Sequence, residues 1–463
     1  MKETILRQQT AFEQHPNPGL GLRKGWLWQL GEMLQESHSA LCDAINQDFG
    51  RRSPAETLLL EVFPTLELIR FCQKNLKGWL ASEKRPTGLW MLPGKCELHP
   101  RPKGVVGIMV PWNFPLFLSL APLAQALAAG NRAMIKLPEA CPQFNAVLKK
   151  ALARQFSLDL VAVVEGGPEA GAEFASLPFN HLLFTGSTSV GKAVMAAASQ
   201  NLTPVTLELG GKSPVIVLDE TELERAAAKV IWAKSLNAGQ TCVSPDYVLV
   251  PQGQEQVFAD LLQKQFHKLY PKWPINPDYT SLIRPQAAVR MQDLLAEAIA
   301  LGCKIQVLAK DEAKEQRRIY APHLVFNPPL TSRVMLEELF CPILPVLGYA
   351  NQAEALSIIA HNPNPLALYL FGEVEKAKAW ALDLPTGGIC INDCLLQVAQ
   401  EGLPFGGVGS SGMGQYHGHE GFLTFSQMKP VFIQPKTNLS SLIQPPYGHL
   451  FQGLVKMMTR TRE

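Results

Sequence analysis

The chain has 463 residues, of which 47% are hydrophobic and 18% charged, so it can bury a large core and, at roughly 150 residues per domain, form two or three domains. Lysine and arginine number 42 against 40 acidic residues, and the formal net charge of +2 argues against a dedicated nucleic-acid binder. Nine scattered cysteines without a Cys-x-x-Cys pair argue against a disulfide framework or a clustered zinc site, and they favour a reducing cytoplasm.

The amino-terminal part of the chain predicts helices. Apolar residues recur at helical spacing over residues 27–34 and 58–69, whereas residues 1–18 are polar and lack the apolar stretch of a signal peptide. Residues 85–94 predict a loop rich in proline and glycine. Residues 96–102 predict an edge strand or arm, because their prolines cannot donate to a neighbouring strand.

An uncharged stretch over residues 105–131 is long enough to span a bilayer. Pro111, Pro115 and Pro122 interrupt it, and lipid would leave the freed backbone groups without hydrogen-bond partners. We therefore expect a buried strand, loop and helix here, and no membrane span.

From residue 104 onward, predicted strands and helices alternate. The first strands cover residues 105–110, 133–137, 160–164 and 181–184, and their helices cover 116–129, 144–155, 169–175 and 190–199. The alternation continues through strands 214–218 and 247–250 and helices 223–236 and 257–270, and it repeats to about residue 393. This pattern predicts two α/β domains with doubly wound parallel sheets, an architecture that commonly binds nucleotides.

Two residues are candidates for a nucleophile and a base. Cys242 follows the polar loop 237–241, which can expose a thiol, although a lone cysteine is more often an inert buried residue. Glu208 stands between leucines at a strand end, where burial raises the pKa of a carboxyl group and suits a general base. The alternative for Glu208 is an ion pair with Lys212.

Asn113 lies between Pro111 and Pro115, which fix the backbone after the strand 105–110. A rigidly held carboxamide can donate to a developing oxyanion. The alternative is a turn in which Asn113 caps the helix 116–129, and the motif alone favours that alternative.

Residues 184–191 run from a strand through a turn into a helix. Gly186 permits the tight turn, Ser187 is a candidate N-cap, and the free N–H groups of such a helix start favour phosphate. Lys136 and Glu139 close an earlier strand of the same predicted sheet, where they can hold ribose hydroxyls or form a surface ion pair.

Two further motifs are residues 337–342 and the glycine-dense loop 403–412. His417 and His419 follow that loop but have no third ligand nearby, so we expect no metal site.

In this order and spacing, the motifs closely resemble the aldehyde dehydrogenase superfamily. The resemblance runs from about residue 111 to 426, with Glu208 and Cys242 34 residues apart inside two extended signatures. The segments most similar to the class-three branch, and within it to coniferyl aldehyde dehydrogenases, are 179–186, 201–214, 242–247 and 414–422.

The resemblance implies an aldehyde dehydrogenase-like α/β fold: two doubly wound α/β domains plus a small β oligomerisation arm. It implies a homodimer formed by exchanging edge strands. The implied parts are a helical and NAD(P)-binding domain (1–94 and 104–207), arm strands (95–103 and 395–435), a catalytic domain (208–394) and a tail (436–463).

The resemblance also implies a reaction, the oxidation of an aldehyde with NAD or NADP. Cys242 is the implied nucleophile, which forms a thiohemiacetal and then a thioester, and Glu208 activates the water that hydrolyses the thioester. Asn113 stabilises the oxyanion together with the backbone N–H of Cys242. The implied cofactor contacts are Lys136 and Glu139 at the adenosine ribose, Trp112 and Ser187 near the pyrophosphate, Glu338 and Phe340 at the nicotinamide and its ribose, and Gly186, Gly191 and Leu209.

The sequence departs from the family pattern at two positions. Cys341 stands where glycine is usual, and Gln397 stands where the class-three branch usually has histidine, which leaves the substrate open between aromatic and medium- or long-chain aliphatic aldehydes. The remaining alternatives are a semialdehyde or CoA-acylating relative, a thiol hydrolase without nucleotide, and a non-catalytic relative of the fold.

Overall fold

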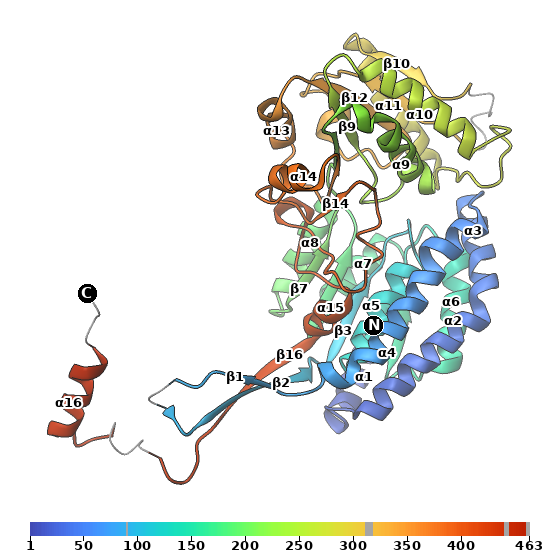
Figure 1. The fold of residues 1–463 in the computed structure, drawn as a ribbon. Coiled ribbons are helices and arrows are strands. Elements are labelled where there is room, and N and C mark those ends of the chain that lie inside the picture. The colour runs from blue at the N-terminus through green and yellow to red at the C-terminus, as the bar shows by residue number, and fades with distance from the viewer. Residues whose placement is uncertain (89–90, 311–317, 439–443, 460–463) are drawn as a thin grey trace.

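Three β-sheets organise the chain in the computed structural model, which describes residues 1–88, 91–310, 318–438 and 444–459 (Figure 1). Within these residues, one six-stranded sheet has the order β15 (Gly412–Met413), β7 (Val205–Glu208), β6 (His181–Thr185), β3 (Val105–Met109), β4 (Arg132–Lys136), β5 (Val161–Val164). Its strands are parallel except for β15, which is antiparallel to β7.

Helices cover this sheet, and its strands are therefore nearly continuous apolar runs. The helices between its strands are α5 (Phe117–Ala128), α6 (Pro142–Gln155), α7 (Pro168–Ala175) and α8 (Thr188–Ser199). The amino-terminal helices packed with them are α1 (Lys2–Gln14), α2 (Leu20–Phe49), α3 (Pro54–Thr57), the π-helical turn η1 (Leu58–Val62) and α4 (Phe63–Trp79). Helix α5 is buried along its whole length, as its uncharged sequence predicts, and none of the described helices is long and apolar enough to cross a membrane.

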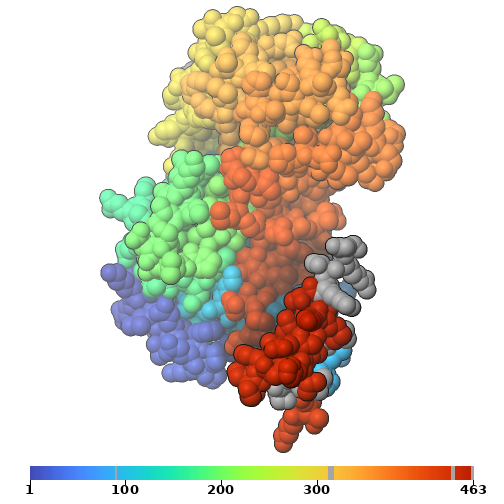
Figure 2. Space-filling model, turned by 90° about the vertical axis from the view of Figure 1, so that its left-hand side faces the viewer, coloured from blue at the N-terminus to red at the C-terminus, as the bar shows by residue number. Residues whose placement is uncertain are grey.

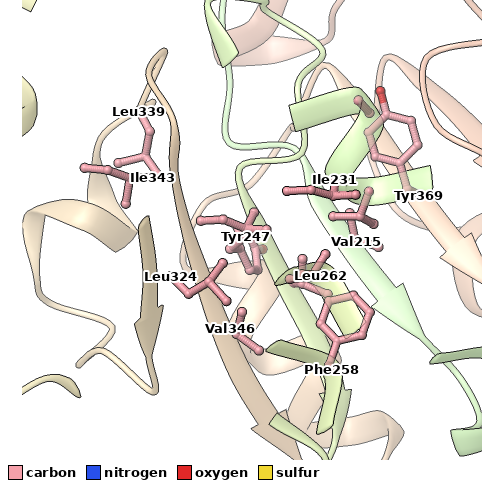
Figure 3. Close-up of a cluster of buried hydrophobic side chains, with 14 of the residues drawn as sticks. Val215, Ile231, Tyr247, Phe258, Leu262, Leu324, Leu339, Ile343, Val346 and Tyr369 are labelled. Carbon is pink, nitrogen blue, oxygen red and sulfur yellow. The ribbon is translucent and has the colours of Figure 1, made fainter. Parts of the chain in front are cut away.

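The second sheet has seven strands within the described residues. Its order is β10 (Lys304–Val307), β11 (His323–Phe326), β12 (Ile343–Tyr349), β9 (Tyr247–Pro251), β8 (Pro214–Val217), β13 (Ala367–Phe371), β14 (Gly388–Ile391). Its helices are α9 (Leu223–Ser235), α10 (Glu255–Leu269), α11 (Pro285–Ala300), α12 (Arg333–Leu336), α13 (Gln352–Ala360) and α14 (Val374–Ala381). Side chains such as Val215, Tyr247 and Val346 from the sheet meet Ile231 and Phe258 from the helices in a continuous core (Figure 3). The two doubly wound α/β parts confirm the predicted architecture.

A third sheet forms the arm, a long ribbon that leaves the body in Figure 1, with the order β1 (Glu83–Arg85), β2 (Lys95–Pro102), β16 (Ser426–Ile433). Of the two alternatives for residues 96–102, an edge strand or an arm, the arm is observed, and the edge-strand alternative is wrong for Cys96–Leu98, which pair with β1 on one side and β16 on the other. Pro100 and Pro102 lie beyond the end of β1, where β2 pairs with β16 alone. The prolines therefore remain at positions without a second neighbouring strand.

The carboxy-terminal part of the chain contributes elements to different parts of the fold. Within the expected arm segment 395–435, only β16 belongs to the arm, so that range was too wide. β15 extends the six-stranded sheet, and α15 (Gly418–Thr424) packs on α4 and α5. The orange-to-red end of the chain extends from the upper lobe along the lower one (Figure 2), and it closes with α16 (His449–Met458), which buries no residue.

Candidate active site

A cavity of about 260 Å³ opens between the two large sheets. It is lined by Pro111, Trp112, Asn113, Thr185, Gly186, Ser187, Leu209, Gly210, Cys242, Arg290, Glu338 and Phe340. The structure thus brings together eight of the twelve residues that the sequence nominated, although they come from five separate segments.

The topology explains this position. β3 and β6 are neighbours, but the chain continues from β3 towards β4 on one side and from β6 towards β7 on the other. Such a switch point opens a crevice at the carboxyl ends of the strands, where the segments 111–113 and 185–187 lie. Cys242 precedes β9, and Glu338 precedes β12, so the amino ends of the second sheet close the cavity from the other side.

The loop before Cys242 has an unusual backbone. Asn237, Ala238 and Gly239 have φ values of 50°, 52° and 74°, three successive residues in the left-handed region. Such strain persists only where the surroundings impose it, and it clusters at functional sites. Gln240 is held on both sides, because its side chain donates to Ser281 O at 3.1 Å and accepts from Ile283 N at 3.0 Å.

Asn113 is buried, and its carboxamide faces the cysteine loop. Its Nδ2 donates to Gln240 O at 3.3 Å. The alternative in which Asn113 caps the following helix is wrong, because Glu61 accepts from the N–H groups of Leu116 and Phe117 at that helix start. One N–H of the carboxamide is engaged with Gln240 O, and the second remains available as a donor in the cavity.

Glu208 ends β7 and is fully surrounded by protein. Neither of its carboxylate oxygens has a hydrogen-bond partner among the described residues, and burial raises its pKa well above the usual value. The expected alternative, an ion pair with Lys212, is wrong: Lys212 donates to Asp246 at 2.9 Å and to Glu337 O at 3.0 Å. An unpartnered carboxyl group with a raised pKa can accept a proton near neutral pH.

Cys242 is partly exposed to the cavity. Burial, followed by the nearby charges of Glu338 and Glu208, raises the pKa of its thiol to about 12. Burial likewise raises the pKa of Glu338 to about 8. Burial therefore raises the pKa of all three groups, Cys242, Glu208 and Glu338.

Glu338 and Phe340 project from the turn before β12. Phe340 has a φ of 51°, which is rare for a bulky residue, and its ring meets that of Trp112 edge-on with centroids 5.5 Å apart. Glu338 Oε1 is buried and has no hydrogen-bond partner in the part of the chain that the structure describes. Arg290, on α11, donates to the backbone carbonyls of Glu338 and Leu339 at 2.8 and 2.6 Å, which fixes this turn. Sequence reasoning missed Arg290, because no motif surrounds it.

The start of α8 forms another wall of the cavity. Ser187 is the N-cap, as expected, but its side chain makes no capping bond. The first N–H groups of α8, beside the cavity-lining Ser187, therefore lack the usual side-chain cap. Gly191 lies one turn further, where a Cβ would come 2.6 Å from Leu209, so the helix packs closely on the strand end below it.

Lys136 and Glu139 lie outside the residues that line the cavity. Lys136 Nζ is 3.3 Å from Glu139 Oε2, and Arg284 Nη2 is 3.6 Å from Glu139 Oε1. The ion pair that the sequence allowed is therefore present, with a second cation beside it.

Both departures from the family pattern lie next to the site. Cys341 is buried, and its carbonyl oxygen would be 2.7 Å from a Cβ on Gly239. Gln397 Nε2 donates to Tyr369 Oη at 3.4 Å, and that hydroxyl donates to Val243 O at 2.6 Å. Within the described residues, no group of three or more His, Cys, Asp or Glu is arranged to hold a metal ion.

Comparison with known proteins identifies the family. Residues 2–431 match the aldehyde dehydrogenase family. A probable coniferyl aldehyde dehydrogenase of Pseudomonas aeruginosa is 47% identical over 456 residues, which cover 98% of this chain and 95% of the relative. The resemblance to coniferyl aldehyde dehydrogenases is thus confirmed.

Comparison with solved structures identifies the same family. The substrate-bound state of Staphylococcus aureus AldH has a TM-score of 0.92 at 35% identity and covers 98% of this chain and 99% of its own. An aldehyde dehydrogenase of Mycobacterium tuberculosis complexed with NAD+ has a TM-score of 0.85 at 26% identity, with 94% and 90% of the two chains covered. The chain therefore belongs to the aldehyde dehydrogenase family of NAD(P)-dependent oxidoreductases.

Proposed function

We propose that the chain oxidises an aldehyde to the carboxylic acid, with Cys242 as nucleophile, Asn113 as oxyanion donor and Glu208 as general base. The observation that carries the proposal is that Cys242 and Asn113 line one cavity, while Glu208, next in sequence to the cavity-lining Leu209, has no hydrogen-bond partner among the described residues. These three groups come from the segment after β3, the end of β7 and the loop before β9.

Cys242 attacks the aldehyde carbon as a thiolate. The new tetrahedral carbon carries an oxyanion, which accepts hydrogen bonds from Asn113 Nδ2 and from the backbone N–H of Cys242. One such donor contributes roughly 10²–10³ in rate. Because burial raises the pKa of the free thiol to about 12, its proton must pass to a base when the thiolate forms, and Glu338 and Glu208 are the carboxyl groups whose charges act on this thiol.

Glu208 acts in the second half of the reaction. It takes a proton from the water that attacks the thioester, and the acid then leaves Cys242 as a free thiol. Its raised pKa suits this task, because a more basic carboxylate takes a proton from water more readily. The presence of this base favours water as acyl acceptor over coenzyme A.

The residues around the cavity fit a nicotinamide dinucleotide. A side chain at Gly186 would overlap the ring of Phe184, so only glycine leaves backbone room beside Ser187 at the start of α8. The orphaned Glu338 Oε1 is an acceptor suited to ribose hydroxyls. Glu338 and Phe340 would hold the nicotinamide end, and Trp112 and Ser187 the pyrophosphate. When bound, the nicotinamide supplies the hydride acceptor.

The adenosine end is assigned to other residues. Lys136 and Glu139 would hold its ribose, and Gly186, Gly191 and Leu209 would shape the wall along which the dinucleotide lies. A carboxylate at Glu139 favours NAD over the 2′-phosphate of NADP.

The proposed substrate class is aromatic aldehydes such as coniferyl aldehyde, since the 47%-identical relative carries that name. Medium- and long-chain aliphatic aldehydes are the second candidates. We also propose a homodimer built on the arm strands β2 and β16, and a cytoplasmic location. Nine free cysteines support a reducing compartment.

Purified protein tests the proposal when it is assayed with NAD and NADP against aromatic, short aliphatic and long aliphatic aldehydes. Cys242→Ser should abolish formation of reduced nicotinamide. Glu208→Gln should retain a burst of reduced nicotinamide but slow steady turnover, because only thioester hydrolysis needs the base. Ester cleavage without nucleotide, if it were the sole activity, would instead identify a thiol hydrolase.

A further inference from the structure

A cluster of buried charges lies behind the cavity, on the side of the amino-terminal helices. This buried charge cluster consists of Arg52, Glu56 and Glu61, whose side chains are 0%, 5% and 0% exposed. Arg52 Nη2 lies 3.0 Å from Glu61 Oε1, and Arg52 Nε lies 3.7 Å from Glu56 Oε1. Since buried ion pairs often add little net stability, such a cluster needs an explanation beyond stability.

The local backbone brings the two carboxylates to one side. Helix α3 passes into the π-helical turn η1, in which Phe63 N bonds to Leu58 O, five residues earlier. Glu61 lies in this turn and Glu56 in the short helix before it, so the turn sets where the two carboxylates lie relative to each other. Single π-helical turns occur frequently at functional sites.

The cluster holds the asparagine segment at both ends. Arg52 Nη1 donates to the backbone oxygen of Asn113 at 2.8 Å. Glu61 Oε2 accepts from the N–H groups of Leu116 and Phe117 at 2.8 and 3.1 Å. The segment that carries the carboxamide is therefore fixed by two side chains from outside the cavity.

The cluster also holds the cysteine loop. Glu56 Oε1 accepts from Asn237 N at 2.9 Å and from Thr280 Oγ1 at 3.2 Å. The side chain of Asn237 donates to the backbone oxygens of Asn113 and Gln240, both at 3.0 Å. One continuous network thus links the two segments that face each other across the reaction site.

We infer that Arg52 is a positioning residue which, with Glu56 and Glu61, aligns the carboxamide of Asn113 with Cys242. Arg52 touches no reacting atom and acts through Asn113. Oxyanion donors contribute most when they are already in place, and a displacement of about 1 Å can cost about 10² in rate. The inference rests on the proposed function and adds a residue that supports it.

A double-mutant cycle on Arg52→Lys and Asn113→Ala tests the inference, with single-turnover formation of reduced nicotinamide as the readout. A lysine keeps the charge but cannot reach three partners at once. We expect R52K to slow the parent by at least about tenfold and the N113A background by less than about twofold, because coupled residues are not additive. An equal loss in both backgrounds, or no loss in the parent, overturns the inference.

Alkylation of Cys242 by iodoacetamide, without nucleotide, separates positioning from general damage. This reaction forms no oxyanion, so R52K should alter its rate by less than about twofold. An alkylation rate that falls as far as the rate of formation of reduced nicotinamide would overturn the inference.

The matched control variant is Arg23→Lys. Arg23 is 1% exposed and donates to Pro18 O and to Ala128 O, at the far end of α5. R23K should lower the melting temperature and leave single-turnover rates unchanged.

Glu61→Gln replaces R52K if that variant does not fold. It keeps an acceptor for the N–H groups at the start of α5 but loses the charge opposite Arg52, so we expect a loss of about threefold or more that again disappears in N113A. If C242S forms reduced nicotinamide at the parent rate, the proposed function fails. If C242S and N113A are impaired but R52K and E61Q are not, only the inference about Arg52 fails.

Discussion

The carboxylate of Glu338 lies against the backbone of Gly210 so closely that a Cβ on Gly210 would overlap its oxygen Oε2. Gly210 begins the crossing from the six-stranded to the seven-stranded sheet, and Glu338 stands before β12 of the second sheet. Because Gly210 has no side chain, its backbone can approach Glu338 of the other domain across the cavity.

Gly210→Ala should displace Glu338 and weaken nucleotide binding by about tenfold, which corresponds to about 1.4 kcal/mol. Titration of NAD against tryptophan fluorescence measures this, since Trp112 lines the same cavity. Gly25→Ala is the control, because a Cβ there meets nothing within 4 Å. Unchanged affinity in G210A would show that Glu338 does not contribute to the nucleotide site.

Glu208→Gln should stabilise the protein more at about pH 8 than at about pH 5. Burial raises the folded-state pKa of Glu208, whereas the unfolded chain has the ordinary value of about 4.3. Protonation of Glu208 makes its full contribution to the free energy of unfolding below the unfolded-state pKa. That contribution is lost as the pH rises through the folded-state pKa. Glutamine does not titrate, so the difference in melting temperature should grow with pH, and a constant difference contradicts the prediction.

Glu338→Gln should speed alkylation of Cys242, and only in alkaline solution. The Glu338 carboxyl group has a pKa of about 8, so its charge raises the thiol pKa only when the pH approaches and passes that value. Because the thiolate is the reactive form, the variant and the parent should react alike near pH 6.5 and diverge above about pH 8. Glu375→Gln, on an exposed face of α14, should follow the parent at every pH.

Periodicity predicted the order of strands and helices, because buried parallel strands and amphipathic helices have distinct local patterns. It did not predict that Gly412 and Met413 pair with Leu207 and Glu208, about 200 residues earlier. A two-residue strand has no periodicity, and its partner is decided by tertiary packing. The same holds for β2, where local proline chemistry indicated an edge but the register with β1 decided the outcome.

The chemistry-bearing residues of the site could be nominated from motifs, but their supports could not. Cys242 and Asn113 lie in distinctive local sequences. Arg52 lies in the loop between α2 and α3, Arg290 lies on α11, and only the fold shows that they donate to backbone carbonyls beside the cavity. Hydrogen bonds to backbone carbonyls place little demand on the neighbouring sequence, so sequence alone gives little sign of them.

Gly239→Ala should be far more damaging than Gly302→Ala, although both glycines have left-handed φ values, 74° and 82°. A Cβ on Gly302 meets nothing within 4 Å, so that variant reports backbone strain alone, about 1–2 kcal/mol. A Cβ on Gly239 would stand 2.7 Å from the carbonyl oxygen of Cys341, and the cysteine loop must shift. We expect G302A to lose stability in urea unfolding with normal turnover, whereas G239A loses at least about tenfold in turnover because Cys242 moves relative to Asn113. Equal turnover in the two variants would mean that the loop tolerates the displacement and that its strained backbone does not set the position of the thiol.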